Sequence, residues 1–318
     1  MIELRSALSH SAPASIEVLR QTCFITGANS NYFWLANTAI QSLREQAPDL
    51  DIRVMDFGFT AEQARFLSNQ GTLLSRPTEI PDNVHPYTLK TCFGLYARPL
   101  PHKNFVWIDS DMLCLMPPSA LIADLLTNMI ERGKKVAACQ DMGPNPTLEE
   151  FARNFRAPAL SHFITANKAL AMKPYLNTGF TVFAGATEFL AKWSRLTAKI
   201  QGEVCIDQNA FNILFHANPV EGLMLDARRW NVHSGLLAEL NTDQQPLACN
   251  GEKIVLLHCT SHQNLYHDEM SVSLKIAGAV VPARFKTFRN QTLRQIHLAT
   301  LERFLKANAA QLKSAGVV

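Results

Sequence analysis

A short apolar run that stops at two acids is the feature that most constrains the fold of this chain. Residues 104–112 read Asn-Phe-Val-Trp-Ile-Asp-Ser-Asp-Met, and residues 105–108 have the length and the β-branched or aromatic content of a fully buried strand. Such strands belong to parallel sheets that are covered on both faces. Asp109 and Asp111 follow at the carboxyl end of the strand, where open α/β sheets bind their ligands.

These two acids are candidate metal ligands. Residues two apart in an extended chain project to the same side, so both carboxylates can face one point while Ser110 faces away. Hard oxygen ligands suit Mg²⁺ or Mn²⁺, and a pair of them leaves coordination positions open for a substrate phosphate. The alternative is a solvated turn or a helix start, because Asp-x-Asp triplets are frequent by chance. The buried strand before the triplet, and Pro117 and Pro118 after it, favour the metal site.

The composition is that of an ordered globular protein of one large domain or two ordinary ones, with 47% hydrophobic and 18% charged residues in 318. A net charge of +3 without a basic stripe indicates that nucleic acid is not a partner. Residues 1–15 carry no hydrophobic signal core, and no segment reaches the ~20 apolar residues of a membrane span. Seven cysteines without Cys-x-x-Cys spacing are typical of buried thiols in a reducing compartment, so we expect a cytoplasmic protein.

The chain opens as a nucleotide-binding α/β unit does. Residues 22–26 are a predicted strand, residues 27–31 a turn of small residues and residues 31–46 a helix. The turn has neither the Gly-x-Gly-x-x-Gly fingerprint nor a P-loop. A second strand is expected over residues 51–56, followed by a helix from its cap at Thr60 to residue 69 and a helix over residues 87–97.

Strands and helices continue to alternate in the later chain. Strands are predicted over residues 136–139, 175–183, 224–230 and 254–258, and helices over residues 119–132, 148–155, 186–200, from 207 onward and over 292–313. With no linker in view, we expect a peripheral segment over residues 1–20 and a single domain over residues 21–318 that ends in a helix. The fold class is α/β, with a mixed, mostly parallel sheet flanked by helices.

Four pieces of the sequence occur in a suggestive order. They are Asp109-Ser110-Asp111, the Leu-Asn-Thr-Gly run of residues 176–179, Asp207-Gln208, and His258 after an apolar strand. Over residues 20–262 this order resembles the retaining nucleotide-sugar glycosyltransferases of the glycogenin and lipopolysaccharide-galactosyltransferase type. The resemblance implies their Rossmann-like fold, called GT-A.

The resemblance also implies roles for individual residues. Asp109, Asp111 and His258 would hold Mn²⁺, or Mg²⁺, against the diphosphate of the donor. The residues expected near the reacting carbon are Asp207, Gln208 and Asn177. The other residues expected to bind the donor are Thr26, Gly27, Ala28, Asn31, Asp56, Lys90, Ser110, Thr178, Gly179 and His262.

Each of these assignments has a purely structural alternative. The Asn-Thr-Gly run would be a turn, Asp207 a helix cap and Lys90 a solvated surface lysine. Apart from the resemblance, Gly179 near the start of its strand itself predicts a close approach of the backbone to a ligand. His258 would be a hydrogen-bonded histidine at a strand end, or part of a zinc cluster with His262 and His267, which the lack of paired cysteines disfavours.

One segment departs from the family pattern. Family members usually follow the histidine with Gly-x-x-Lys-Pro-Trp, whose lysine touches the diphosphate, whereas residues 259–266 read Cys-Thr-Ser-His-Gln-Asn-Leu-Tyr. The phosphate contact is then expected from His262, Lys90 or Lys275.

The sequence therefore predicts a metal-dependent glycosyltransferase that moves a hexose from a UDP-linked sugar to a glycan, lipid-linked or protein acceptor, with retention. An inverting reaction would need a general base, for which Asp207 and Asp141 are candidates. The alternative from another class is a catalytically silent GT-A domain that binds nucleotide or glycan. A nucleotidyltransferase would be expected to carry basic residues in its first loop, and residues 27–31 include none.

Overall fold

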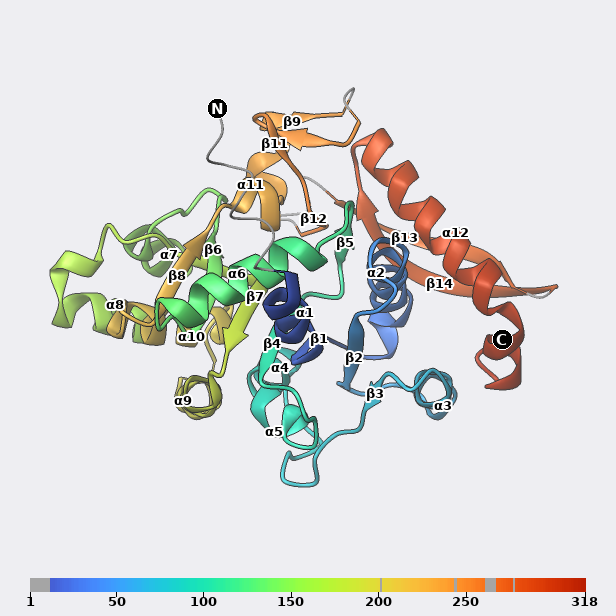
Figure 1. The fold of residues 1–318 in the computed structure, drawn as a ribbon, viewed down its shortest axis with the longest axis horizontal. Coiled ribbons are helices and arrows are strands. Elements are labelled where there is room, and N and C mark those ends of the chain that lie inside the picture. The colour runs from blue at the N-terminus through green and yellow to red at the C-terminus, as the bar shows by residue number, and fades with distance from the viewer. Residues whose placement is uncertain (1–11, 201, 243–244, 261–266, 277) are drawn as a thin grey trace.

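A seven-stranded sheet forms the centre of the protein, of which a computed structural model describes residues 12–200, 202–242, 245–260, 267–276 and 278–318 (Figure 1). The strand order is β3-β2-β1-β4-β7-β6-β8. These strands are β1 (Thr22–Ala28), β2 (Asp51–Asp56), β3 (Leu73–Leu74), β4 (Asn104–Ile108), β6 (Val136–Gln140), β7 (Leu176–Ala184) and β8 (Gly222–Leu225). β7 is antiparallel to its neighbours β4 and β6, and the other pairs of this sheet are parallel. The expected mixed, mostly parallel sheet is confirmed.

Helices cover both faces of the sheet, and the side chains of β4 alternate between them. Val106 and Ile108 pack in the layer of α2 (Phe33–Gln46), α6 (Ser119–Glu131) and α12 (Gln291–Ser314). Phe105 and Trp107 pack in the layer of α4 (Pro86–Thr91), α5 (Phe93–Ala97), α9 (Thr187–Lys199) and α10 (Ile206–Ala217). Every residue of β4 is buried, which confirms the strand predicted from its composition.

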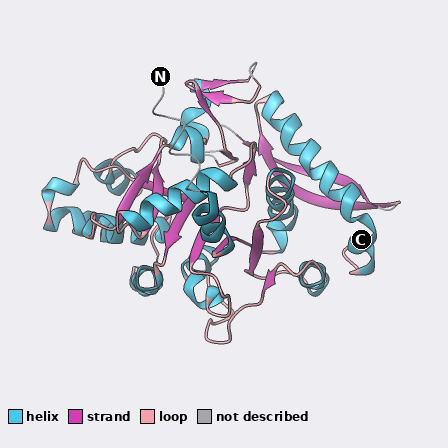
Figure 2. Cartoon of the chain, viewed as in Figure 1, coloured by secondary structure: helices cyan, strands magenta, loops and turns pink. Residues whose placement is uncertain are grey.

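Shorter elements surround these layers. β5 (Met112–Cys114) pairs with β12 (Leu256–His258), while β9 (Leu240–Asn241), β10 (Ala248–Cys249) and β11 (Glu252–Lys253) form a small sheet at the top of Figure 2. The other helices are α1 (Ala12–Arg20), α3 (Ala61–Asn69), α7 (Leu148–Asn154), α8 (Pro158–Ala166), α11 (Ala227–Trp230) and the 3-10 turns η1 (Ser30–Tyr32), η2 (Lys168–Leu170) and η3 (Ser234–Glu239). Among the described residues, no helix combines the length and the apolar character of a membrane span.

A long hairpin of β13 (His267–Ile276) and β14 (Ala279–Phe288) precedes the C-terminal helix, in a stretch that is not among the strands expected from the sequence. Phe285 and Phe288 of β14 are buried in the same cluster as Leu293 and Phe304 of α12. α12 lies across this hairpin and beside α2, at the right of Figure 1. Burial against α12 therefore supports the hairpin.

Residues 12–20, within the segment expected to be peripheral, form α1, and Val18 and Leu19 pack against the core. Two local predictions need correction. The strand expected over residues 224–230 ends at Leu225, because the Asp226 carboxylate accepts a hydrogen bond at 2.9 Å from a backbone N–H and caps α11. The helix expected over residues 87–97 is interrupted at Cys92, between α4 and α5.

Candidate active site

A cleft of about 380 Å³ lies at the carboxyl end of β4 and has the size of a small-molecule site. The predicted residues that line it are Gly27, Ala28, Lys90, Asp109, Ser110, Asp111, Asn177, Thr178, Asp207, Gln208 and His258. They come from the end of β1, from α4, from the loop after β4, and from β7, α10 and β12. The fold thus brings all four of the suggestive sequence pieces to one place.

Four other predicted residues, all of them within the described chain, do not line this cleft. Thr26 is buried in β1, and its hydroxyl has no hydrogen-bond partner among the described residues. Asn31 is exposed in η1. The Asp56 carboxylate accepts hydrogen bonds at 2.8 and 2.9 Å from the backbone of the turn that follows it. Gly179 lies behind the ring of His258, and His262 is outside the described residues.

Asp109, Asp111 and His258 each bring one ligand atom to within 4.8 Å of the others. His258 Nε2 lies 3.1 Å from Asp111 Oδ1 and 3.8 Å from Asp109 Oδ2. The pairing of β12 with β5 places His258 opposite Met112, directly after the acids. Strand register therefore holds the histidine beside the two carboxylates.

Two neighbours fix the orientation of the His258 ring. Its Nδ1 lies 2.8 Å from Asn231 Oδ1, and Asn231 in turn donates to Asn177 Oδ1 at 2.9 Å. Because Asn231 Oδ1 accepts from Nδ1–H, Nε2 is the ring nitrogen that faces the acids. A Cβ at position 179 would lie 2.4 Å from His258 Cε1, so the close approach expected at Gly179 is made by this imidazole.

Lys90 is buried rather than solvated, which corrects the surface alternative. Its Nζ lies 2.8 Å from Asp109 Oδ1 and 3.5 Å from Asp207 Oδ2, and it donates to Thr178 Oγ1 at 3.1 Å. Burial alone would lower the pKa of Lys90, but the two carboxylates outweigh it and the pKa is raised. Burial also raises the pKa of Asp207, and the Lys90 ammonium opposes that shift.

Lys286 is a residue of the cleft that the sequence pattern does not reveal. Its Nζ donates to Asp111 Oδ2 at 2.5 Å, although Lys286 lies on β14, 175 positions from Asp111 in the chain. Burial would raise the pKa of Asp111, but Lys286 and His258 hold it well below its usual range. Lys275, the phosphate contact considered from the sequence, is exposed and is not among the described residues that line the cleft.

A buried hydrogen-bond network surrounds Asp141 on the other side of the cleft. Asp141 Oδ2 accepts from Asn177 Nδ2 at 3.3 Å and from Gln208 Nε2 at 3.4 Å. Gln208 Oε1 also accepts from the Thr178 backbone N–H at 3.3 Å. Both carboxamides are therefore held in place before any substrate is bound.

Comparison with known proteins identifies the architecture. No protein-family model and no curated protein matches the chain. The bifunctional glycosyltransferase WbbM is similar in structure with a TM-score of 0.52 at 16% identity, over 76% of this chain and 46% of WbbM. Mouse xyloside xylosyltransferase 1 gives 0.51 at 14%, over 76% and 98% of the two chains. The glycosyltransferase GlyE of Streptococcus pneumoniae TIGR4 gives 0.51 at 15%, over 92% of this chain and 64% of GlyE.

The fold is GT-A. This confirms the fold that the sequence resemblance implies. The chain spans less than half of WbbM, at 46%, and less than two thirds of GlyE, at 64%.

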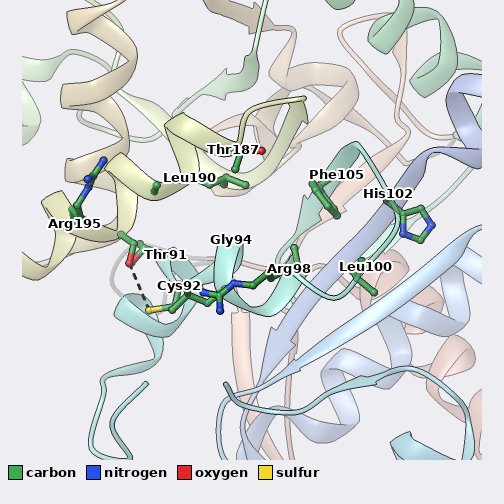
Figure 3. A pocket seen from close by; sticks show the side chains of 14 residues that line it. Thr91, Cys92, Gly94, Arg98, Leu100, His102, Phe105, Thr187, Leu190 and Arg195 are labelled. Atoms are coloured by element: carbon green, nitrogen blue, oxygen red, sulfur yellow. Dashed lines mark hydrogen bonds between the residues drawn. The ribbon is translucent and has the colours of Figure 1, made fainter. Parts of the chain in front are cut away.

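A larger hollow of this GT-A fold, of about 580 Å³, lies near the amino end of β4 between α5 and α9 (Figure 3). Its walls include the apolar side chains of Leu95, Leu100, Phe105 and Leu190. None of the described residues that line it is acidic. We therefore place the candidate chemistry in the smaller cleft, where carboxylates, ammonium groups and an imidazole meet.

A second group of possible metal ligands, Cys23, Asp51 and His102, lies near the amino end of the same sheet. The Asp51 carboxylate is already engaged, at 2.7 Å by Arg53 Nε and at 3.2 Å by His102 Nε2. A guanidinium so close disfavours a cation at this position.

Proposed function

We propose that this chain is a metal-dependent glycosyltransferase that moves a hexose from a UDP-linked sugar to a glycan, lipid-linked or protein acceptor, with retention. The observation that carries the proposal is the convergence of Asp109, Asp111 and His258 within 4.8 Å, at the edge of the sheet where α/β folds bind ligands. The shared fold with three proteins named as glycosyltransferases supports the same class of reaction.

The three side chains fit Mn²⁺ or Mg²⁺. Two carboxylates and one imidazole form a mixed oxygen and nitrogen donor set, which Mn²⁺ accepts more readily than Mg²⁺. Asn231 turns His258 Nε2 toward the acids, as expected of a metal-ligating histidine. A divalent ion held there would offset the negative charge that the leaving diphosphate gains.

Neighbouring residues would orient the sugar and stabilise its developing positive charge. Asp207 is buried, and its Oδ2 lies 3.5 Å from Lys90 Nζ, so its carboxylate is held at a set position. Gln208 and Asn177 are fixed through Asp141. A retaining reaction needs no protein base if a leaving phosphate oxygen takes the acceptor proton, whereas an inverting reaction would use Asp141 or Asp207.

The first test is hydrolysis of a panel of nucleotide sugars without acceptor, with Mn²⁺ and with a chelator. Wild type is compared with Asp111→Asn and with Asp124→Asn, the same change at an exposed acid of α6. We expect Mn²⁺-dependent release of UDP from one sugar donor, lost in Asp111→Asn and kept in Asp124→Asn.

Calorimetry with UDP and Mn²⁺ on the same samples separates the alternatives. Metal-dependent nucleotide binding without turnover, even when acceptors are supplied, would favour the silent GT-A module. A wild-type protein that binds neither metal nor nucleotide would end the glycosyltransferase proposal. Analysis of the product's anomeric configuration by NMR decides between retention and inversion.

A cytoplasmic location and a single domain over residues 21–318 belong to the same proposal. The seven cysteines are free, in keeping with a reducing compartment.

Phe24 of β1 and Phe304 of α12 lie in one core cluster, which supports a single cooperative unit. Two well-separated unfolding transitions would contradict the single domain.

A further inference from the structure

The Lys286 ammonium lies beside the carboxylate of Asp111, one of the three candidate metal ligands. Its Nζ is 2.5 Å from Asp111 Oδ2, its side chain is 14% exposed, and it lines the cleft. The other oxygen of the same carboxylate, Oδ1, faces His258 Nε2 at 3.1 Å. Both oxygens of Asp111 are therefore engaged, one by an ammonium and one by the imidazole.

The hairpin holds the base of Lys286 firmly while its long side chain stays adjustable. Phe285 and Thr287, on the opposite face of β14, contact His297 of α12 at a ring distance of 4.6 Å and an Nδ1 to Oγ1 distance of 3.2 Å. Because side chains alternate along a strand, these contacts turn Lys286 toward the cleft. Its four-carbon stem can still move the ammonium between neighbouring anions.

Lys90, the second lysine of the cleft, has an ammonium group that is held by more partners than that of Lys286. Lys90 lies between Asp109 and Asp207 and also donates to Thr178. The hydrogen bond of Lys286 in the described structure is with Asp111. A divalent ion on Asp111 and His258 would repel the nearby Lys286 ammonium, whereas a diphosphate would attract it.

We propose that Lys286 is a two-position residue, which neutralises Asp111 in the metal-free protein and contacts the donor diphosphate once a divalent ion is bound. This inference rests on the proposed function. It assigns to β14 the phosphate contact for which the sequence offers His262, Lys90 or Lys275. It also implies that Lys286 opposes the binding of free metal and favours the binding of nucleotide with metal.

Lys286 is thus expected to weaken the binding of free Mn²⁺ and to strengthen the binding of UDP with Mn²⁺. Two binding titrations therefore test the inference. We would titrate MnCl₂ by electron paramagnetic resonance without nucleotide, and UDP by calorimetry at saturating Mn²⁺. Lys286→Met is expected to bind Mn²⁺ about tenfold more tightly. It is expected to bind UDP about 10- to 100-fold more weakly, because a charge-assisted hydrogen bond is lost. Lys275→Met, at an exposed lysine of the same hairpin, should match wild type in both titrations.

Lys286→Arg is the second variant and keeps the charge if Lys286→Met does not fold. A guanidinium can bind the Asp111 carboxylate through two donors, so free Mn²⁺ should bind several-fold more weakly while UDP binding is retained. Parallel weakening of both ligands in Lys286→Met would indicate a structural role and overturn the inference. An unchanged affinity for free Mn²⁺ in either variant would overturn it too. Failure of wild type to bind Mn²⁺ and UDP would instead refute the proposed function.

Discussion

The Lys90 ammonium lies 2.8 Å from a carboxylate oxygen of Asp109, within the buried layer between α4 and the sheet. The indole N–H of Trp107 donates to the same oxygen at 2.7 Å. Lys90 also reaches Asp207 at the start of α10. One lysine thus joins an acid after the central strand to an acid on a separate helix, and α4 is fixed between them.

Removal of this lysine should destabilise the fold. Lys90→Met leaves the buried Asp207 and the half-buried Asp109 without their cation, and we expect the free energy of unfolding to fall by about 3 kcal/mol. Urea denaturation measures it, with Lys192→Met as the control, because Lys192 forms an exposed pair with Glu188 and should cost under about 0.5 kcal/mol. In Lys90→Met/Asp109→Asn the loss should be less than the sum of the two single changes, and strict additivity would argue against the pair.

A methyl group at position 179 should weaken the metal site through His258. In Gly179→Ala the new Cβ would lie 2.4 Å from His258 Cε1 and push the imidazole from its position. We expect Mn²⁺ affinity to fall about 10- to 100-fold, as for the loss of an orienting contact. Gly94→Ala is the control, because its Cβ would meet Leu190 at an ordinary 3.4 Å. Equal Mn²⁺ affinities in the two variants would show that the ring position is unimportant.

The hydrogen bond from His258 to Asn231 should also strengthen the binding of Mn²⁺. Asn231→Leu removes the acceptor at 2.8 Å from Nδ1, and Mn²⁺ binding measured by calorimetry should weaken by about tenfold or more. Asn231→Asp keeps an acceptor there and is expected to bind Mn²⁺ within about threefold of wild type. If the Asp variant lost as much affinity as the Leu variant, the acceptor role would be excluded.

Stability should fall in mild acid because of His297. Burial lowers the pKa of His297 from 6.5 to about 3, with Lys286 acting in the same direction and Asp111 against it. The unfolded chain therefore takes up this proton first, so the free energy of unfolding is steady above pH 6.5 and falls as the pH drops toward 3. At pH 5 the loss from this group is about 2 kcal/mol relative to pH 7.5.

Urea unfolding at the two pH values would detect this loss. His297→Gln should lose less stability than wild type between pH 7.5 and pH 5, by about that 2 kcal/mol. His162→Gln, at an exposed histidine of α8, should follow wild type. The same pH dependence in all three proteins would rule out His297 as its source.

Much of the fold could be predicted from local patterns. β2 runs over Asp51–Asp56 as expected, and Thr60 caps α3 with a reciprocal hydrogen bond to Gln63. The burial of β4 follows from its unbroken apolar run. β13 and β14 were missed although apolar residues alternate with polar ones in both, with Val272, Leu274 and Ile276 in β13 and Val281, Ala283 and Phe285 in β14. What the sequence does not show is that these apolar side chains share a core with α12.

The sequence by itself determined the order of the principal elements and the two acids at the end of β4, because periodicity and strand composition report each residue's local environment. The tertiary structure alone decided which distant groups meet those acids. Lys286 reaches Asp111 across 175 positions, and Asn231 orients His258 from a separate helix end. Such pairs depend on strand register and packing, and a contact made across the fold leaves no periodic signal in either segment.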